Sequence, residues 1–241
     1  MEHRVDVILP CLDEAAALPW IMDRLPRRYR AIVVDNGSSD GSDLIAAELG
    51  ALVVHEARRG YGAAVQAGLA AATADLVVIM DCDATIDPVE LPALVAVLLD
   101  DPAELVCGRR RPVDRGSWPL HSRIANAVLA ALLSLGGRVR LHDLAPVRVA
   151  WRRPLLGLAI TDGRYGYPLQ TLLRAGRAGW RVVERDVSYR SRPDGSRSKI
   201  TGTLRGTVAV ATDMLRVARA EARPVVAHGG AAAARRDGVA R

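Results

Sequence analysis

Five short apolar runs in the first half of the chain constrain its fold more than any other feature. They cover Val5–Leu9, Ala31–Val34, Leu52–Val54, Leu76–Met80 and Leu105–Val106. Apolar runs that are continuous rather than alternating predict strands buried on both faces, as in parallel sheets. Segments with helical spacing separate them, namely Glu14–Leu25, Leu44–Leu49, Ala63–Ala72 and Asp87–Leu99. The pattern predicts an α/β fold with a doubly wound, mostly parallel sheet.

The second half of the chain has a looser pattern. Its predicted elements are a helix over Ile124–Leu135, an irregular stretch at 142–153 (HDLAPVRVAWRR), a helix near Leu169–Ala175, a strand over Trp180–Tyr189 and a last helix over Ile200–Ala220. The last helix has an apolar stripe, typical of a helix that docks on its own domain or rests on a membrane. The stripe consists of Leu204, Val208, Ala211 and Leu215. We predict that the low-complexity tail, residues 221–241, is disordered.

Composition narrows the class of protein. The chain has 241 residues and a formal charge of +6, which suits phosphorylated substrates, nucleic acid or an anionic membrane. Its cysteines (Cys11, Cys82 and Cys107) lack metal-ligand spacing, so we expect reduced thiols in a cytosolic protein. Acidic residues come too early for a secretory signal, and no apolar run approaches the ~18 residues that span a bilayer.

Polar residues follow four of the predicted strands, at Pro10–Glu14, Asp35–Asp40, Arg58–Gly62 and Asp81–Asp83. Each segment alone could be a simple turn, because Asp, Asn, Gly and Ser are common turn residues. In open α/β sheets, however, ligands bind beyond the carboxyl ends of the strands. Four polar strand ends at one edge therefore favour a shared binding site.

Asp81 and Asp83 are two carboxylates at the end of one strand. Paired anions in such a place call for a cation, and hard oxygen ligands suit Mg²⁺ or Mn²⁺. These ions usually take their remaining ligands from water and substrate phosphates. A metal-bridged diphosphate is the expected occupant.

Three enzyme classes use such a pair. Asp81, Asp83 and Thr85 match the D-x-D-x-T motif of haloacid-dehalogenase phosphatases, but that motif follows their first core strand, whereas here it follows the fourth. Nucleotidyltransferases open with a Gly-rich basic loop, and ILPCLDEAA is not one. Glycosyltransferases of the GT-A fold carry the pair after an early-middle strand, where it holds a metal on a nucleotide-sugar diphosphate. The position in the chain favours this third class.

Longer stretches resemble family 2 glycosyltransferases. VDVILPCLDEAAALP is similar to their opening V-I-x-P-x-x-N-E-x, and IVVDNGSSDGS to their V-V-D-D-G-S-x-D-G-T loop. GYGAAVQAGLAAATADLVVIMDCDATIDPVEL is similar to their G-x-G-x-A-x-x-x-G-L…D-A-D…D-P-x-x-L run. VCGRRR, WPLHSR, HDLAPVR and GSRSKI resemble segments of dolichyl-phosphate mannose synthases and bacterial polyprenyl-phosphate glycosyltransferases. The resemblance implies one GT-A domain over 1–220, with a nucleotide-sugar-binding half (1–110) and an acceptor half (111–220).

The chain departs from the family pattern in places. Asp13 replaces the usual Asn, and Asn36 replaces the second Asp of the loop. Thr85 stands where the mannose synthases often have a metal-binding Gln. Pro146 and Val147 replace a Gly-Phe pair on the acceptor side.

The resemblance also implies roles for individual residues. The metal ligands would be Asp81 and Asp83, with Asp83 the firmer one. The donor nucleotide sugar would contact Pro10, Leu12, Asp13, Glu14, Asp35, Gly37, Ser38, Arg59, Gly60, Asp81 and Cys82. The acceptor phosphate would contact Arg110, Arg123, Arg197 and Lys199, the only lysine. A solvated basic face is the alternative for these cations.

Asp143 is the candidate catalytic carboxylate besides Asp83. It would take a proton from a hydroxyl acceptor. With a phosphate acceptor, which is already ionised, it would orient an Arg or the sugar instead. His142 is a further candidate metal ligand, although a lone His is more often structural.

The sequence thus predicts an inverting, metal-dependent glycosyltransferase with a GDP-mannose or UDP-glucose type of donor and a polyprenyl- or dolichyl-phosphate acceptor. The alternatives are the same chemistry on a soluble hydroxyl acceptor, and a phosphatase or non-catalytic nucleotide binder. We expect a cytoplasmic protein at the inner face of the membrane that does not bind nucleic acid. Peripheral membrane contact and a homodimer are both compatible with the sequence.

Overall fold

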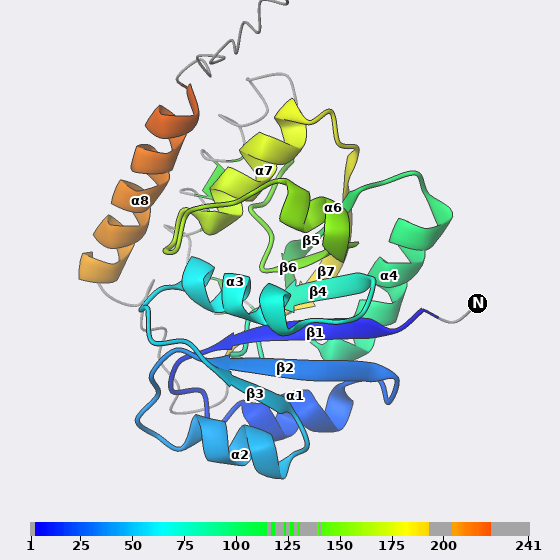
Figure 1. Cartoon of the computed structure of the whole chain (residues 1–241), viewed down its shortest axis with the longest axis vertical. Coiled ribbons are helices and arrows are strands. Elements are labelled where there is room, and N and C mark those ends of the chain that lie inside the picture. The colour runs from blue at the N-terminus through cyan, green and yellow to red at the C-terminus, as the bar shows by residue number, and fades with distance from the viewer. Residues whose placement is uncertain are drawn as a thin grey trace, which may run out of the picture.

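One sheet organises the chain. The computed structural model describes residues 3–114, 117–118, 123, 126–127, 130, 139, 141–192 and 204–222. In this part of the chain the strands form a seven-stranded sheet with the order β3-β2-β1-β4-β6-β5-β7 (Figure 1). The strands are β1 (Val5–Cys11), β2 (Tyr29–Asp35), β3 (Leu52–His55), β4 (Leu76–Met80), β5 (Leu105–Pro112), β6 (Val147–Trp151) and β7 (Val182–Tyr189). The predicted α/β sheet is confirmed.

Helices cover both faces of the sheet. The described helices are α1 (Leu18–Arg24), α2 (Ser42–Glu48), α3 (Tyr61–Ala71), α4 (Leu91–Asp100) after the 3₁₀ turn η1 (Pro88–Glu90), α6 (Arg152–Gly157), α7 (Tyr167–Arg177) and α8 (Leu204–Ala222). Along β1, Val7 and Leu9 face the layer that contains α1, α2 and α4, whereas Ile8 faces the layer with α3, α6, α7 and α8. Both layers are apolar, which explains why the strand sequences are continuous apolar runs.

β6 is the main departure from the sequence prediction, which expected an irregular stretch at 142–153. Its five residues, VRVAW, carry an arginine at the second position, yet the first four are buried. β6 pairs antiparallel with β4 and with β5. Since it runs against its neighbours, its first residue, Val147, lies opposite Met80 at the carboxyl end of β4. The segment before β6 is thereby brought to the edge where the polar loops gather.

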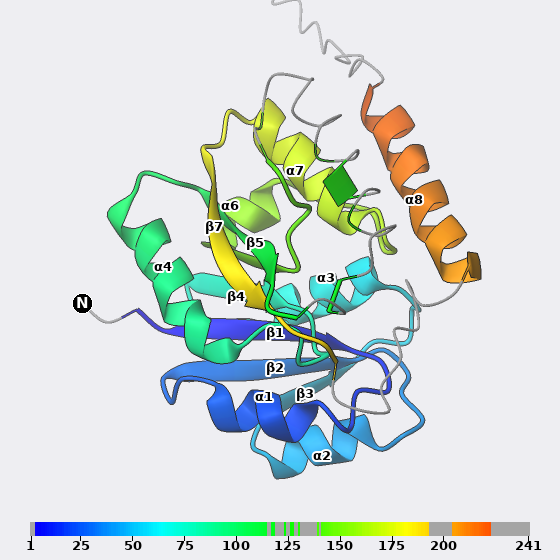
Figure 2. The same cartoon turned by 180° about the vertical axis from the view of Figure 1, so that it is seen from behind.

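The far edge of the sheet is made by β5 and β7, which pair in parallel from Leu105 opposite Val182 to Pro112 opposite Tyr189 (Figure 2). Beyond this ladder, Tyr189 forms a bridge with Ile86, and the Arg190 N–H donates to the Thr85 carbonyl oxygen at 2.9 Å. The end of β7 therefore reaches the loop that follows β4.

The C-terminal helix α8 contacts the domain through residues that are not in its predicted apolar stripe. Met214 and Val217 are buried in the apolar layer, whereas Leu215 of the predicted stripe is 56% exposed. The helix continues through Glu221, which is buried and accepts hydrogen bonds from Gln170 and from arginines of α7. The disordered tail predicted to start at residue 221 therefore begins too early. Most of the predicted helix Ile124–Leu135 lies outside the described residues.

Candidate active site

The loop after β1 is tied to the loop after β2. The Asp13 N–H donates to Ser38 Oγ at 2.9 Å, and the Glu14 N–H donates to Ser42 Oγ at 2.9 Å. Asp13 Oδ1 in turn accepts from the Ser39 N–H at 2.6 Å. Asp13 has a φ of 51°, in the left-handed region that Asp and Asn tolerate better than most side chains. The two loops therefore form one surface, and Asp, like the usual Asn, is among the side chains that tolerate this backbone conformation best.

Asp35 organises the turn after β2. Its carboxylate accepts from the N–H groups of Gly37 and Ser38, each at 3.1 Å, and His55 Nδ1 lies 3.6 Å away. Burial by itself would raise the pKa of Asp35, but the hydrogen bonds from Ser38 and Gly37 outweigh it and hold the pKa below its usual value. An ionised acceptor is thus fixed at this strand end.

The loop between β3 and α3 is held against the same turn. Asn36 Nδ2 donates to the Arg58 carbonyl oxygen at 2.9 Å, and Asn36 Oδ1 accepts from the Gly60 N–H at 2.7 Å. This dual use requires an amide, which explains why Asn replaces the second Asp of the family pattern. Gly37 has a φ of +86°, and a Cβ there would lie 3.0 Å from Cζ of Arg59. Glycine at this position lets the Arg59 guanidinium lie against the main chain.

The start of α3 packs main chain against main chain on the loop before α7. A Cβ on Gly60 would lie 2.3 Å from the carbonyl oxygen of Gly163, and one on Gly62 would lie 2.1 Å from that of Asp162. The Ala63 N–H donates to the Gly163 carbonyl oxygen at 2.8 Å. A side chain at either glycine would push these segments apart.

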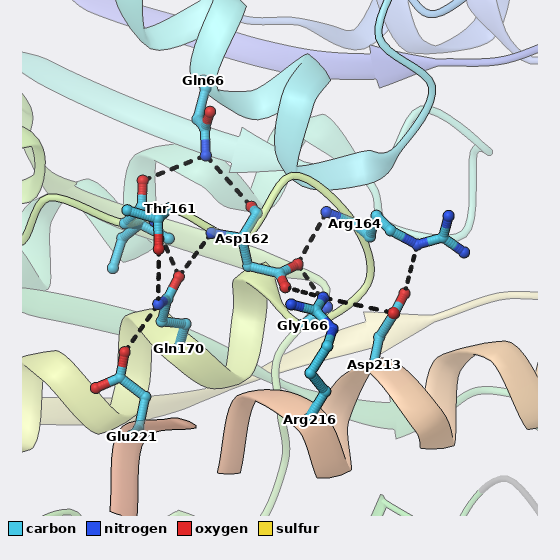
Figure 3. A network of polar contacts seen from close by, with 10 residues as sticks. Gln66, Thr161, Asp162, Arg164, Gly166, Gln170, Asp213, Arg216 and Glu221 are labelled. Carbon is cyan, nitrogen blue, oxygen red and sulfur yellow. Dashed lines mark hydrogen bonds and ion pairs between the residues drawn. The ribbon is translucent and has the colours of Figure 1, made fainter. Parts of the chain in front are cut away.

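Asp162 is the centre of a polar network that joins this loop to α8 (Figure 3). Its buried carboxylate accepts from the N–H groups of Arg164 (2.8 Å) and Gly166 (3.1 Å) and from Arg216 on α8. Arg164 Nε donates to Asp213 Oδ2 at 3.0 Å, which adds a second link to α8. The helix is thus connected, through this loop, to the first turn of α3. The sequence analysis did not anticipate this network, because its members are far apart in the chain.

Asp81 and Asp83 follow β4 directly. Asp83 Oδ1 accepts from Thr85 Oγ1 at 2.6 Å and from the Thr85 N–H at 3.1 Å. Burial, and then the charge of Asp83, raise the pKa of Asp81 to about 7, against the opposing charges of Arg110 and Arg148. Two carboxylates that disfavour each other's charge in this way form a site that a cation would stabilise.

A guanidinium already lies on these carboxylates. Arg192 Nη2 is 2.7 Å from Asp83 Oδ2, and Arg192 Nη1 is 3.0 Å from Glu14 Oε1. The bond between Arg190 and Thr85 at the end of β7 brings it there. Arg192 was not among the predicted site residues. The sequence signal that could have indicated Arg192 was its position in the Arg-rich segment after the last predicted strand.

Asp143 and Arg110 form a buried pair. Asp143 Oδ2 accepts from the Arg110 N–H (2.8 Å) and Nε (2.9 Å), and Oδ1 accepts from Nη2 (2.5 Å) and from the Ala145 N–H (3.0 Å). The Arg110 guanidinium also donates to Asn126 and lies 4.2 Å from the Trp118 ring centroid. Burial by itself would raise the pKa of Asp143, but the hydrogen bonds and charge of Arg110 outweigh it and lower the pKa. Such a carboxylate is a poor proton acceptor.

Other predicted residues have different surroundings. The Cys82 side chain is buried in the apolar layer with α1 and α4, so only its main chain can face a donor. His142 is exposed, and its Nδ1 lies 2.7 Å from Glu184 Oε2. Arg123 is exposed. Arg197 and Lys199 lie outside the described residues.

Arg148 on β6 was missed because the sequence analysis expected no strand there. It is 2% exposed, it donates to the Leu144 carbonyl oxygen, and its Nε has no hydrogen-bond partner within the described part of the chain. Its positive charge lowers the pKa of Asp81, against the effect of burial.

Asp81 and Asp83 are the residues that could hold a divalent metal. Carboxylate oxygens suit a hard cation, and the guanidinium on Asp83 and Glu14 shows that these carboxylates accept positive charge. Within the described ranges, no three His, Cys, Asp or Glu side chains converge on one point. A metal here would depend on water and a diphosphate for its remaining ligands.

Comparisons with known proteins identify the family. A family model described as glycosyl transferase family 2 matches residues 4–155. An uncharacterised glycosyltransferase of Mycobacterium tuberculosis is 49% identical over 213 residues, which cover 88% of this chain and 97% of that protein. A polyprenol monophosphomannose synthase of Mycolicibacterium smegmatis is 31% identical over 225 residues (83% and 82%), and a dolichyl-phosphate hexose transferase of Haloferax volcanii is 29% identical over 189 residues (77% and 82%).

Among solved structures, glucosyl-3-phosphoglycerate synthase from Mycobacterium tuberculosis, in complex with Mn²⁺, uridine-diphosphate and glucosyl-3-phosphoglycerate, superposes with a TM-score of 0.73. The two are 22% identical, and the match covers 91% of this chain and 80% of that chain, which shows the fold. The fold is that of the GT-A glycosyltransferases. Because the family model matches more than half of the sequence, the chain belongs to glycosyl transferase family 2 and is an enzyme of that class. Among the described helices, none has the length and apolar character needed to cross a membrane.

Proposed function

We propose that this enzyme transfers a sugar, with inversion, from a nucleotide-diphosphate sugar of the GDP-mannose or UDP-glucose type to a polyprenyl- or dolichyl-phosphate. Two relatives are named for polyprenol and dolichyl-phosphate acceptors. The observation that carries the acceptor class is the Asp143–Arg110 pair. A carboxylate that accepts four hydrogen bonds, three of them from one arginine, is not available to deprotonate a hydroxyl.

A phosphate acceptor does not need that base. A phosphomonoester has a second pKa of about 6 and is largely a dianion at neutral pH. One of its oxygens attacks the anomeric carbon as the bond from that carbon to the diphosphate oxygen breaks, so the configuration inverts. Asp143 then acts by holding Arg110, with Arg123, Arg197 and Lys199 as the other proposed phosphate contacts.

The donor side uses the strand-end loops. Asp35 is proposed to accept from the base or ribose, and the Arg59 guanidinium above Gly37 lies where it could meet the nucleotide. Mg²⁺ or Mn²⁺ held by Asp81 and Asp83 would neutralise the charge that grows on the leaving diphosphate. A second structure of glucosyl-3-phosphoglycerate synthase, matched at 25% identity, contains Mn²⁺, uridine-diphosphate and phosphoglyceric acid, which supports a divalent cation.

A lipid acceptor implies contact with a membrane. We propose a cytoplasmic protein that reaches the inner face of the membrane peripherally. On α8, Leu215 is exposed beside Arg216, and Arg219 is exposed as well, a combination that suits an anionic lipid surface. A homodimer remains compatible with this arrangement.

The test is label transfer by purified protein with Mn²⁺, from labelled GDP-mannose or UDP-glucose, with a polyprenyl phosphate. Label should enter the butanol-extractable lipid, and Asp83→Ala should abolish the transfer. Label confined to a water-soluble product would replace the lipid acceptor with a hydroxyl acceptor. The proposal fails if no nucleotide sugar is turned over, or if Asp83→Ala is as active as the wild type.

A further inference from the structure

Arg192 bridges two loops at the point where the metal is proposed to bind. Its two terminal nitrogens contact different carboxylates, Nη2 with Asp83 Oδ2 at 2.7 Å and Nη1 with Glu14 Oε1 at 3.0 Å. The side chains are largely enclosed, with 21% of Arg192, 9% of Asp83 and 12% of Glu14 exposed. Enclosed ion pairs of this kind are screened less than surface pairs.

The oxygens of Asp83 are both in use. Oδ1 accepts two hydrogen bonds from Thr85, and Oδ2 accepts from Arg192. A divalent ion that binds Asp83 through Oδ2 would have to replace the guanidinium, because the two cations would otherwise share one oxygen and repel each other. The other contacts of Asp83 do not oppose such an exchange, since Thr85 holds the carboxylate from its other oxygen.

We propose that Arg192 is an internal counter-ion of Asp83 and Glu14 that a divalent metal displaces. Arg192 neutralises the two carboxylates, and it leaves Asp83 when the metal binds. Binding of the metal and displacement of Arg192 are then one event. The affinity for the metal therefore depends on where residues 190–192, which follow β7, hold the Arg192 side chain. This inference rests on the proposed function to the extent that it takes Asp83 as a metal ligand.

The test is binding of Mn²⁺ alone, followed through the electron paramagnetic resonance signal of the free ion, with full-length protein and no nucleotide. Arg192→Gln removes the competing charge and should tighten Mn²⁺ binding by about tenfold or more, because hydrogen bonds to charged groups are worth about that much. Arg192→Lys keeps a positive charge but loses the forked guanidinium that spans two carboxylates. Its Mn²⁺ affinity should lie between those of the wild type and Arg192→Gln.

Arg190→Gln is the matched control. Arg190 lies two positions earlier, pairs with Asp87 at 3.2 Å and is 46% exposed, so its loss should leave Mn²⁺ binding unchanged. Melting temperatures provide a second measurement. Without metal, Arg192→Gln should melt below the wild type, and Mn²⁺ should raise its melting temperature more than that of the wild type.

Two results would overturn the inference. If Arg192→Gln binds Mn²⁺ no more tightly than the wild type, Arg192 does not compete with the metal, while the proposed function still stands. If neither protein binds Mn²⁺, even when UDP or GDP is added to supply the diphosphate ligands, the metal site itself is absent and the proposed function fails with it.

Discussion

Replacing Asp143 with Asn tests whether this carboxylate positions Arg110 or acts as a base. In the native structure Asp143 is 1% exposed and accepts four hydrogen bonds, three of them from Arg110. An Asn side chain keeps one acceptor oxygen but turns an NH₂ group toward the donors of the guanidinium. The variant should therefore be less stable, and Arg110 should be less firmly oriented.

The size of the effect follows from burial. Breaking a buried ion pair by removing one partner costs about 3–5 kcal/mol. Asn retains part of the hydrogen bonding, and Arg110 is 18% exposed, so we expect a loss of about 2–3 kcal/mol. For a chain of this size that corresponds to a fall of roughly 5–10 °C in melting temperature.

Kinetics separate the two roles. If Asp143 positions Arg110, Asp143→Asn should raise the KM for the lipid phosphate about tenfold or more while kcat falls less than about tenfold. The rate should still rise as pH increases through about 6, because that step reports ionisation of the acceptor phosphate. Both proteins are to be assayed well below their melting temperatures.

Asp6→Asn is the matched control. Asp6 is also buried, accepts from Arg30 in a two-pronged pair and from two main-chain N–H groups, but lies at the amino end of β1, opposite the site. It should lose comparable stability and keep wild-type KM and kcat. The positioning role is refuted if Asp143→Asn lowers kcat by about a hundredfold or more with an unchanged acceptor KM, which is the signature of a lost general base.

Nucleotide-sugar binding and the pH dependence of stability give further tests. Gly37→Ala strains a φ of +86° and crowds Arg59, so the donor KM should rise about tenfold with little change in kcat, measured by initial rates. Asp162→Asn weakens the link between α8 and the loop beside α3, so calorimetry should show weaker nucleotide binding without loss of the Mn²⁺ site. The pKa of Asp143 is lowered in the folded protein, so its stabilising contribution is complete above an unfolded pKa of about 3.9 and is lost as pH falls through the folded pKa. The stability gap between wild type and Asp143→Asn should therefore be constant near neutral pH and close below about pH 4, as followed by urea unfolding; a gap that widens in acid would contradict this.

Much of the sheet and of the donor side could be predicted from local sequence. The run Leu76–Met80, for example, has no polar residue and was predicted as a strand, and β4 has the same bounds. Because parallel strands place their carboxyl ends at one edge, the order of the runs also predicted that Asp35, Asp81 and Asp83 would share an edge. β6 was missed because a strand of five residues that contains a buried arginine has no apolar run to reveal it.

The class of fold and the two aspartates of the candidate site could be read from the sequence, since both depend on residues adjacent in the chain. What those aspartates contact depends on the tertiary structure. The antiparallel course of β6 carries Asp143 to Arg110, and the end of β7, held at Thr85, carries Arg192 to Asp83. Contacts between residues so far apart in the chain depend on strand order and direction, and no local pattern encodes these.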